Sequence, residues 1–204
     1  MNPTGLKLAV LGAGLAAALA GAAVYQTVRQ APECFGTAVA GGAIGGPFEL
    51  IDTTGRIVTD TDVITEPAIL YFGYSFCPDV CPIDAARNAA AVDILAEAGH
   101  SVTPVFISID PDRDTPEVLA DYVINFHPKM IGLTGSDAQV KAAANAYRVV
   151  YNKADDDPEY YLMNHSVFSY FMHPEDGFVS FFRREDAPQA MADQVACFLD
   201  NRDA

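Results

Sequence analysis

Two cysteines, Cys77 and Cys81, stand four positions apart after an apolar run, and a histidine, His165, lies far downstream. If the cysteines lie on a helical turn, positions i and i+4 share one face, with Cβ atoms about 5–6 Å apart. Two thiolates on one face can bind one soft metal ion or close a disulfide. A histidine brought from a distant loop would complete a site of two thiolates and one imidazole. Such donors select copper(I) or zinc over hard cations, so the sequence predicts a metal site at these three residues.

Simpler interpretations of the same residues stay open. The cysteine pair could form only a structural disulfide, or it could bind zinc, which would require a fourth permanent ligand. His165 could be an ordinary loop histidine. The other three histidines, His100, His127 and His173, stand at a helix end, beside a proline and at a turn, and we expect them at the surface.

Apolar runs and capping residues predict the elements that must position this chemistry. Helices are expected over 83–98, 116–126, 136–147 and 187–199, and strands over 48–51, 56–58, 68–74, 104–109, 130–133, 149–152, 167–172 and 178–182. Strands that alternate with helices, followed by a hairpin and a last helix, predict an α/β sandwich around a mixed sheet. The order matches a thioredoxin-like fold with an N-terminal β-hairpin extension.

The cysteine pair falls where a central strand of this predicted sheet ends and a helix begins. Open α/β sheets place their sites at the carboxyl ends of their strands. A helix N-terminus also stabilises a thiolate and so lowers the pKa of a nearby thiol. Both arguments favour a reactive site over an inert cysteine pair.

An uncharged apolar segment at 8–25 follows Lys7. Eighteen helical residues span about 27 Å, close to the thickness of the membrane hydrocarbon. The segment predicts a single transmembrane helix with its N-terminus in the cytoplasm; a cleaved signal peptide is the alternative, and either would export the domain. We therefore expect an anchor over 1–30, a glycine-containing linker over 31–46 and one domain over 47–204.

The charge is strongly negative. The whole chain carries a formal net charge of −15 from 12 basic and 27 acidic residues. A surface this acidic argues against nucleic-acid binding, which requires a basic footprint. It fits a soluble domain that attracts cations or a basic partner.

Cys34 follows the apolar segment, and Cys197 lies near the C-terminus. The ends of a domain are often close in space, and exported proteins form disulfides. A Cys34–Cys197 disulfide is therefore plausible; two unpaired thiols are the alternative.

Three motifs resemble the Sco/SenC family in order and spacing. They are GYSFCPDVCP at 73–82, VFISIDPDRDTP at 105–116 and Asn164-His165-Ser166 with PEDG at 174–177. The resemblance covers roughly residues 46–199. Its members are membrane-anchored, thioredoxin-like copper proteins that help to assemble the copper A centre of cytochrome c oxidase.

The resemblance implies a function and a setting. Cys77, Cys81 and His165 would bind a copper ion, as Cu(I) or Cu(II), and the chain would be a metallochaperone rather than an enzyme. Its partners would be the copper A subunit of the oxidase and a copper donor chaperone. Its place would be the cell inner membrane with the domain facing the periplasm, or the mitochondrial intermembrane space.

Two segments depart from the usual family pattern. Asn164 stands where an aspartate usually precedes the histidine, and Ile83-Asp84 replaces the usual Thr-Glu. Neither change removes an expected ligand.

A second function uses the same cysteines. A membrane-anchored thiol-disulfide oxidoreductase could reduce cysteines of the oxidase subunit, and a peroxidase is a weaker third option. Dedicated oxidoreductases usually have Cys-x-x-Cys spacing, and disulfide exchange does not require His165. Both features favour copper delivery.

Overall fold

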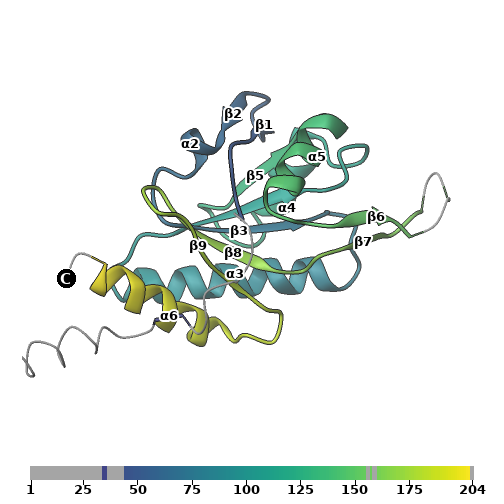
Figure 1. The fold of residues 1–204 in the computed structure, drawn as a ribbon. Coiled ribbons are helices and arrows are strands. Elements are labelled where there is room, and N and C mark those ends of the chain that lie inside the picture. The colour runs from purple at the N-terminus through teal and green to yellow at the C-terminus, as the bar shows by residue number, and fades with distance from the viewer. Residues whose placement is uncertain (1–33, 36–43, 155–156, 158–159, 203–204) are drawn as a thin grey trace, which may run out of the picture.

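A seven-stranded mixed sheet forms the centre of the molecule (Figure 1). The computed structural model describes residues 34–35, 44–154, 157 and 160–202. The strands of the sheet are β1 (Glu49–Asp52), β2 (Ile57–Thr59), β3 (Ala68–Gly73), β4 (Thr103–Ser108), β5 (Ile131–Thr134), β8 (Ser169–His173) and β9 (Gly177–Phe182). Their order is β2-β1-β5-β4-β3-β8-β9. Strands β3, β4 and β5 are parallel, whereas β1 pairs with β5, and β8 with β3, in antiparallel fashion.

Helices cover both faces of this sheet (Figure 1). On one face α3 (Val80–Glu97) and α6 (Pro188–Asn201) pack against Ile69 and Phe171; on the other lie α4 (Pro116–Val123) and α5 (Asp137–Ala146). Because both faces are covered, every residue of β3 is buried, as its continuous apolar sequence predicts. The predicted α/β sandwich with an N-terminal hairpin, β1–β2, is confirmed.

Three local features differ from the predictions. Helix α3 begins at Val80 rather than at residue 83, because Pro82 fits in a first turn, where a backbone N–H has no acceptor within the helix. A short helix, α2 (Asp60–Val63), was not predicted. Neither was strand β7 (Met163–His165), which pairs with β6 (Tyr151–Lys153) in a separate antiparallel hairpin.

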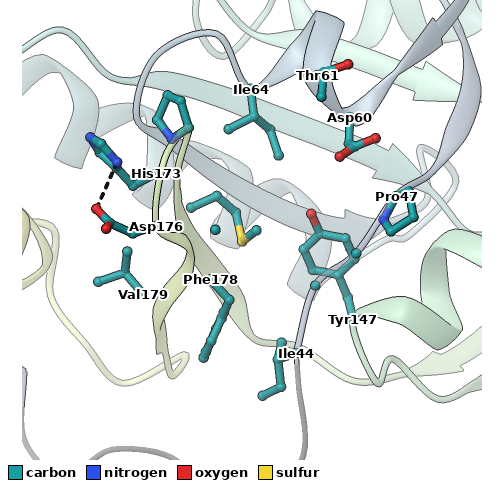
Figure 2. A pocket seen from close by; sticks show the side chains of 15 residues that line it. Ile44, Pro47, Asp60, Thr61, Ile64, Tyr147, His173, Asp176, Phe178 and Val179 are labelled. Atoms are coloured by element: carbon teal, nitrogen blue, oxygen red, sulfur yellow. Dashed lines mark ion pairs between the residues drawn. The ribbon is translucent and has the colours of Figure 1, made fainter.

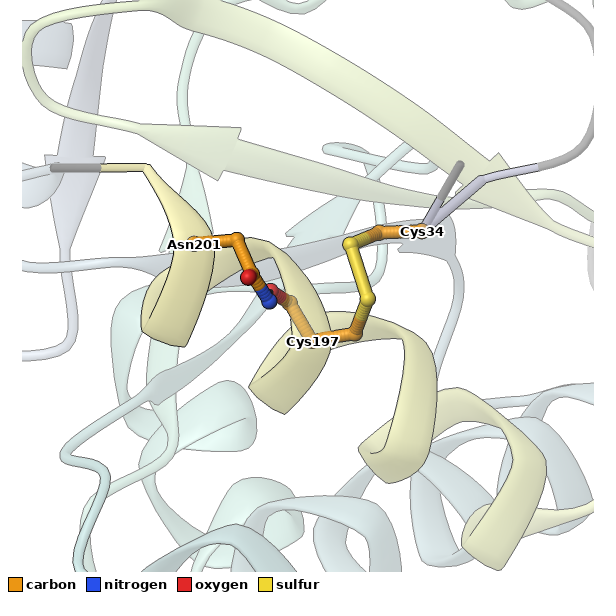
Figure 3. The surroundings of a disulfide bond; sticks show 3 residues. All are labelled: Cys34, Cys197 and Asn201. Carbon is orange, nitrogen blue, oxygen red and sulfur yellow. A yellow bond between two sulfur atoms is a disulfide. The ribbon is translucent and has the colours of Figure 1, made fainter. Parts of the chain in front are cut away.

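A disulfide joins Cys34 to Cys197 on α6, with 5.4 Å between their Cα atoms (Figure 3). The Cys34–Cys197 pairing considered from the sequence is therefore confirmed. Next to it, the ring of Phe35 packs near the rings of Phe171, Phe182 and Phe198. Residues 34–35 are thus held to the domain by a covalent bond and by an aromatic cluster.

The predicted membrane anchor over 1–30 and most of the linker over 31–46 lie outside the described residues. Within the part that the structure describes, no helix has the length and hydropathy needed to cross a membrane.

Candidate metal centre

The loop that carries Cys77 leaves the end of β3 and leads into α3. Its course is fixed locally by the N–H of Cys77, which donates to the carbonyl of Tyr74 at 3.3 Å. Cys77 precedes the N-cap residue, Asp79, whereas Cys81 lies in the first turn. The two cysteines therefore do not share one helical face; the loop folds back and places the first thiol over the start of the helix.

The two thiols are free, and they differ in environment. The N–H of Cys81 donates to Cys77 Sγ at 3.3 Å. Burial acts to raise the pKa of Cys77, but hydrogen bonds from the backbone of Cys81 and Asp79 outweigh it and hold the pKa below its ordinary value. Burial raises the pKa of Cys81, which is 0% exposed. In the metal-free chain Cys77 is therefore the thiol that ionises first.

His165 reaches this pair from the end of β7. Its Nε2 lies 3.4 Å from Cys81 Sγ, while its Nδ1 lies 2.8 Å from the carbonyl oxygen of Ser166. A carbonyl only accepts, so Nδ1 carries the proton and donates to it, which leaves the lone pair of Nε2 facing the thiol. Burial lowers the pKa of His165 below its ordinary value, which also favours the neutral, ligating form.

Two tyrosines enclose the imidazole. The rings of Tyr71 and Tyr74 meet the His165 ring edge-on, with centroids 6.1 and 6.0 Å away. The Tyr74 hydroxyl accepts a hydrogen bond from the N–H of Met163 at 3.2 Å. Apolar ring faces and one hydrogen bond thus fix the strand that carries the histidine.

The three predicted residues meet through Cys81, which contacts both Cys77 and His165. Among the described residues, no group of three or more His, Cys, Asp or Glu side chains is arranged to hold a metal ion. The donor chemistry nevertheless fits copper(I), because two thiols and an unprotonated imidazole nitrogen are the soft ligands it prefers. Binding would require Cys77 and His165 to close around a common centre with Cys81.

A buried carboxylate lies behind Cys81. Asp84 is 1% exposed, accepts a hydrogen bond from the Tyr71 hydroxyl at 3.1 Å and lies 3.3 Å from the guanidinium of Arg87. Burial raises the pKa of Asp84. The sequence marked this acid as a departure from the family pattern, but no sequence signal identified Tyr71 as its partner.

Asn164, the other departure, lies on the exposed side of β7. Neighbouring residues of a strand point to opposite faces, so its amide points away from the face on which His165 meets Cys81. The amide therefore has no part in that contact.

A cavity of about 650 Å³ lies at the opposite end of the sheet, and none of the three predicted ligands lines it (Figure 2). It adjoins Met172, which pairs with Ala68 at the start of β3, whereas the cysteine loop follows the end of that strand. His173 lines it too, with Nδ1 3.0 Å from Asp176. The prediction that His173 is a surface residue was wrong, because its side chain is covered and paired with a carboxylate.

Known proteins are similar to this chain in both sequence and fold. Residues 37–200 match the SCO1/SenC family. Protein SenC of Rhodobacter capsulatus is 54% identical over 176 residues, which make up 86% of this chain and 80% of that protein. SCO1 homolog 1 of Arabidopsis thaliana, a mitochondrial protein, is 46% identical over 154 residues, or 75% of this chain and 46% of that protein. The solved structure of copper-bound ScoI from Arabidopsis thaliana has a TM-score of 0.74 and 44% identity, covering 78% of this chain and 99% of that one.

Proposed function

Because this chain belongs to the SCO1/SenC family, we propose that it binds copper and delivers it to the copper A centre of cytochrome c oxidase during assembly. Cys77, Cys81 and His165 are the proposed ligands. The observation that carries the proposal is the 3.4 Å contact between Cys81 Sγ and His165 Nε2. A copper-bound relative of the same fold supports it.

The chemistry of this site suits a cargo ion better than a permanent one. Two thiolates and one imidazole satisfy copper(I) in a near-trigonal arrangement, and copper(II) would add a further ligand. Cys77, at 9% exposed, and the half-buried His165 are more accessible than Cys81, which is fully buried, so an acceptor site would reach these two ligands first. An acceptor site could then replace the ligands one at a time.

A thiol-disulfide exchange role remains the second candidate because of one specific observation. The pKa of Cys77 is held below its ordinary value by hydrogen bonds from the backbone, and its thiol lies against Cys81. A thiolate next to a second thiol is the arrangement that attacks a disulfide and then resolves the mixed intermediate. The chain could use it on cysteines of the oxidase subunit.

The proposed setting is the cell inner membrane, with one transmembrane helix and the domain facing the periplasm, or the intermembrane space of a mitochondrion. The disulfide between Cys34 and Cys197 supports an oxidising compartment. The proposed partners are a copper donor chaperone and the copper A subunit.

Copper titration of the full-length chain with Cys77 and Cys81 reduced tests the metal site. We expect one copper ion per chain and, with copper(II), a sulfur-to-metal charge-transfer band. Cys77→Ser and Cys81→Ser should abolish the band, and His165→Ala should weaken binding. His100→Ala, which removes a histidine paired with Asp200 instead, is the matched control and should change neither. Unchanged stoichiometry and spectrum in both Cys77→Ser and His165→Ala would reject the assignment.

A further inference from the structure

The turn at 110–114 carries the sequence Asp-Pro-Asp-Arg-Asp, and none of its residues is a proposed copper ligand. It follows the end of β4, where Ser108 pairs with Gly73 at the end of β3. Since β3 and β4 are parallel, the turn lies at the same edge of the sheet as the cysteine loop. The turn therefore lies beside the proposed metal site.

One end of the turn holds the cysteine loop. Asp114 is fully buried and accepts hydrogen bonds from the N–H of Ser75 at 3.1 Å, from the Ser75 hydroxyl and from the Ser108 hydroxyl at 2.6 Å. Ser75 stands two positions before Cys77. A buried carboxylate with this many donors fixes both the start of the loop and the end of β4.

The other end of the turn holds the segment that leads to His165. The hydroxyl of Tyr161 donates to Asp110 Oδ1 at 2.5 Å, and Arg113 Nη1 donates to the Tyr161 carbonyl at 2.9 Å. The guanidinium carbon of Arg113 lies 3.6 Å from the centre of the Tyr161 ring. Tyr161 is thus held by its hydroxyl, its backbone and its ring face, four positions before the histidine.

Arg113 contacts both the cysteine loop and the segment that leads to His165. Its Nε donates to Asp110 Oδ2 at 2.6 Å, and its guanidinium carbon also lies 4.8 Å from the ring centre of Phe76, the neighbour of Cys77. The Arg113 side chain is only 14% exposed. A planar guanidinium can stack on rings and donate along its edge at once, whereas a lysine ammonium cannot.

We propose that Arg113 is a positioning residue for the copper site, an inference that rests on the proposed function. With Asp110 and Tyr161 it holds the β6–β7 hairpin against the body of the domain, so that His165 stays over Cys81 before copper arrives. The affinity for copper and the coordination of copper(II) then depend on a side chain that does not touch the ion.

Arg113→Lys in the full-length chain is the principal test, with Arg56→Lys as its matched control. Arg56 makes a similar two-point contact with Asp52, on the β1–β2 hairpin. Substitution of groups that orient metal ligands typically weakens metal binding by 10–100-fold. We expect Arg113→Lys to weaken copper(I) binding about tenfold and to shift the copper(II) charge-transfer band, while Arg56→Lys changes neither.

Amide hydrogen exchange of the metal-free chain provides a readout that does not require copper. The N–H of Ser166 donates to the carbonyl of Val150, and that of Met163 donates to Tyr74. Both amides should exchange at least about tenfold faster in Arg113→Lys than in Arg56→Lys. Tyr161→Phe, which removes only the hydroxyl bond to Asp110, should give the same changes to a smaller extent and covers the case in which Arg113→Lys does not fold.

A double-mutant comparison separates positioning from general destabilisation. In a His165→Ala background, Arg113→Lys should weaken copper binding much less than in the wild type, because the residue acts mainly through the histidine. An equal loss in both backgrounds would overturn the proposal, and so would affinity, spectrum and exchange rates that match Arg56→Lys. If the wild type bound no copper while the exchange rates still differed, the copper function itself would be wrong and the hairpin contact would stand.

Discussion

Cys81 Sγ lies 3.4 Å from His165 Nε2, although 84 positions separate the two residues. The contact exists because α3 begins beside the end of β3 and because β7 ends at His165 on a hairpin held to the same edge of the sheet. An unfolded chain has no such site. Copper bound to all three proposed ligands should therefore stabilise the folded domain.

His165→Ala separates copper delivery from thiol reduction, because it leaves both thiols able to exchange and removes one proposed metal ligand. Under delivery, cells that carry this variant should lose most oxidase activity, and added copper should restore part of it. Spectra of copper A and oxidase assays at limiting and at added copper measure this. Normal copper A assembly in His165→Ala cells at limiting copper, together with failure in Cys77→Ser cells, would instead favour the thiol-disulfide oxidoreductase.

Cys77 should react with iodoacetamide before Cys81 in the metal-free chain. The pKa of Cys77 lies below its ordinary value and that of Cys81 above it, and Cys81 is fully buried. Each unit of separation changes the relative thiolate population about tenfold, so we expect Cys77 to react at least about tenfold faster at pH 7. The rate should fall as the pH is lowered through the pKa of Cys77, since protonation removes the nucleophile. Mass spectrometry of peptides after brief labelling measures both rates, and equal labelling would contradict the assigned difference.

Gly73→Ala should disturb the site through packing. A Cβ atom at this position would lie 2.7 Å from a Tyr71 ring carbon and 3.2 Å from Cys81 Sγ, so the tyrosine must shift. We expect a loss of about 1–3 kcal/mol in unfolding free energy, together with weaker copper binding. Denaturant unfolding and copper titration measure the two effects.

Gly99→Ala is the control for that variant. Gly99 has a φ of +91° and open space around it, so alanine there strains the backbone without touching a neighbour. It should cost about 1–2 kcal/mol and leave copper binding unchanged. Weaker copper binding in both variants would show that lost stability, rather than displaced ligands, is the cause.

Much of the fold was predictable because its signals are local. The continuous apolar sequence of β3 predicts a strand buried on both faces, and Ser136 with Gln139 forms the capping box expected at the start of α5. These signals depend on residues within one element. They therefore do not depend on the conformation of the rest of the chain.

The details of the site were less predictable because they depend on distant residues. Strand β7 has only three residues, so its alternation of one buried, one exposed and one half-buried residue is too short to predict a strand from the sequence. The stacking of Arg113 on Tyr161 joins residues 48 positions apart, and the same separation applies to the hydrogen bond between them. The cysteine spacing suggested a shared helical face, whereas the loop geometry, set partly by Asp114, places Cys77 before the helix.

Cys197→Ala should destabilise the domain without removing its proposed copper site. The disulfide closes a loop with a sequence separation of 163, and loops of this size typically contribute about 3–5 kcal/mol to unfolding free energy. The Phe35 ring would also lose its fixed place among its aromatic neighbours. Chemical denaturation of the variant and the wild type measures the loss. Copper affinity should stay within about twofold, and a larger change would show that the disulfide also supports the metal site.

Asp52→Asn tests the pH dependence of the β1–β2 hairpin. Burial acts to raise the pKa of Asp52, but hydrogen bonds from Thr54 and Arg56 outweigh it and lower the pKa from 3.8 to about 2. The folded state therefore favours the charged carboxylate, whose contribution is complete above pH 3.8 and disappears as the pH falls toward 2. Because Arg56 is exposed and solvent screens the pair, we expect a cost of only about 1 kcal/mol for Asp52→Asn at pH 7.

The variant and the wild type should converge in unfolding free energy between pH 4 and pH 2. Asp121→Asn, at an exposed position on α4, is the control and should track the wild type throughout. A cost for Asp52→Asn that stays constant across this pH range would mean that the charge of Asp52 does not stabilise the hairpin.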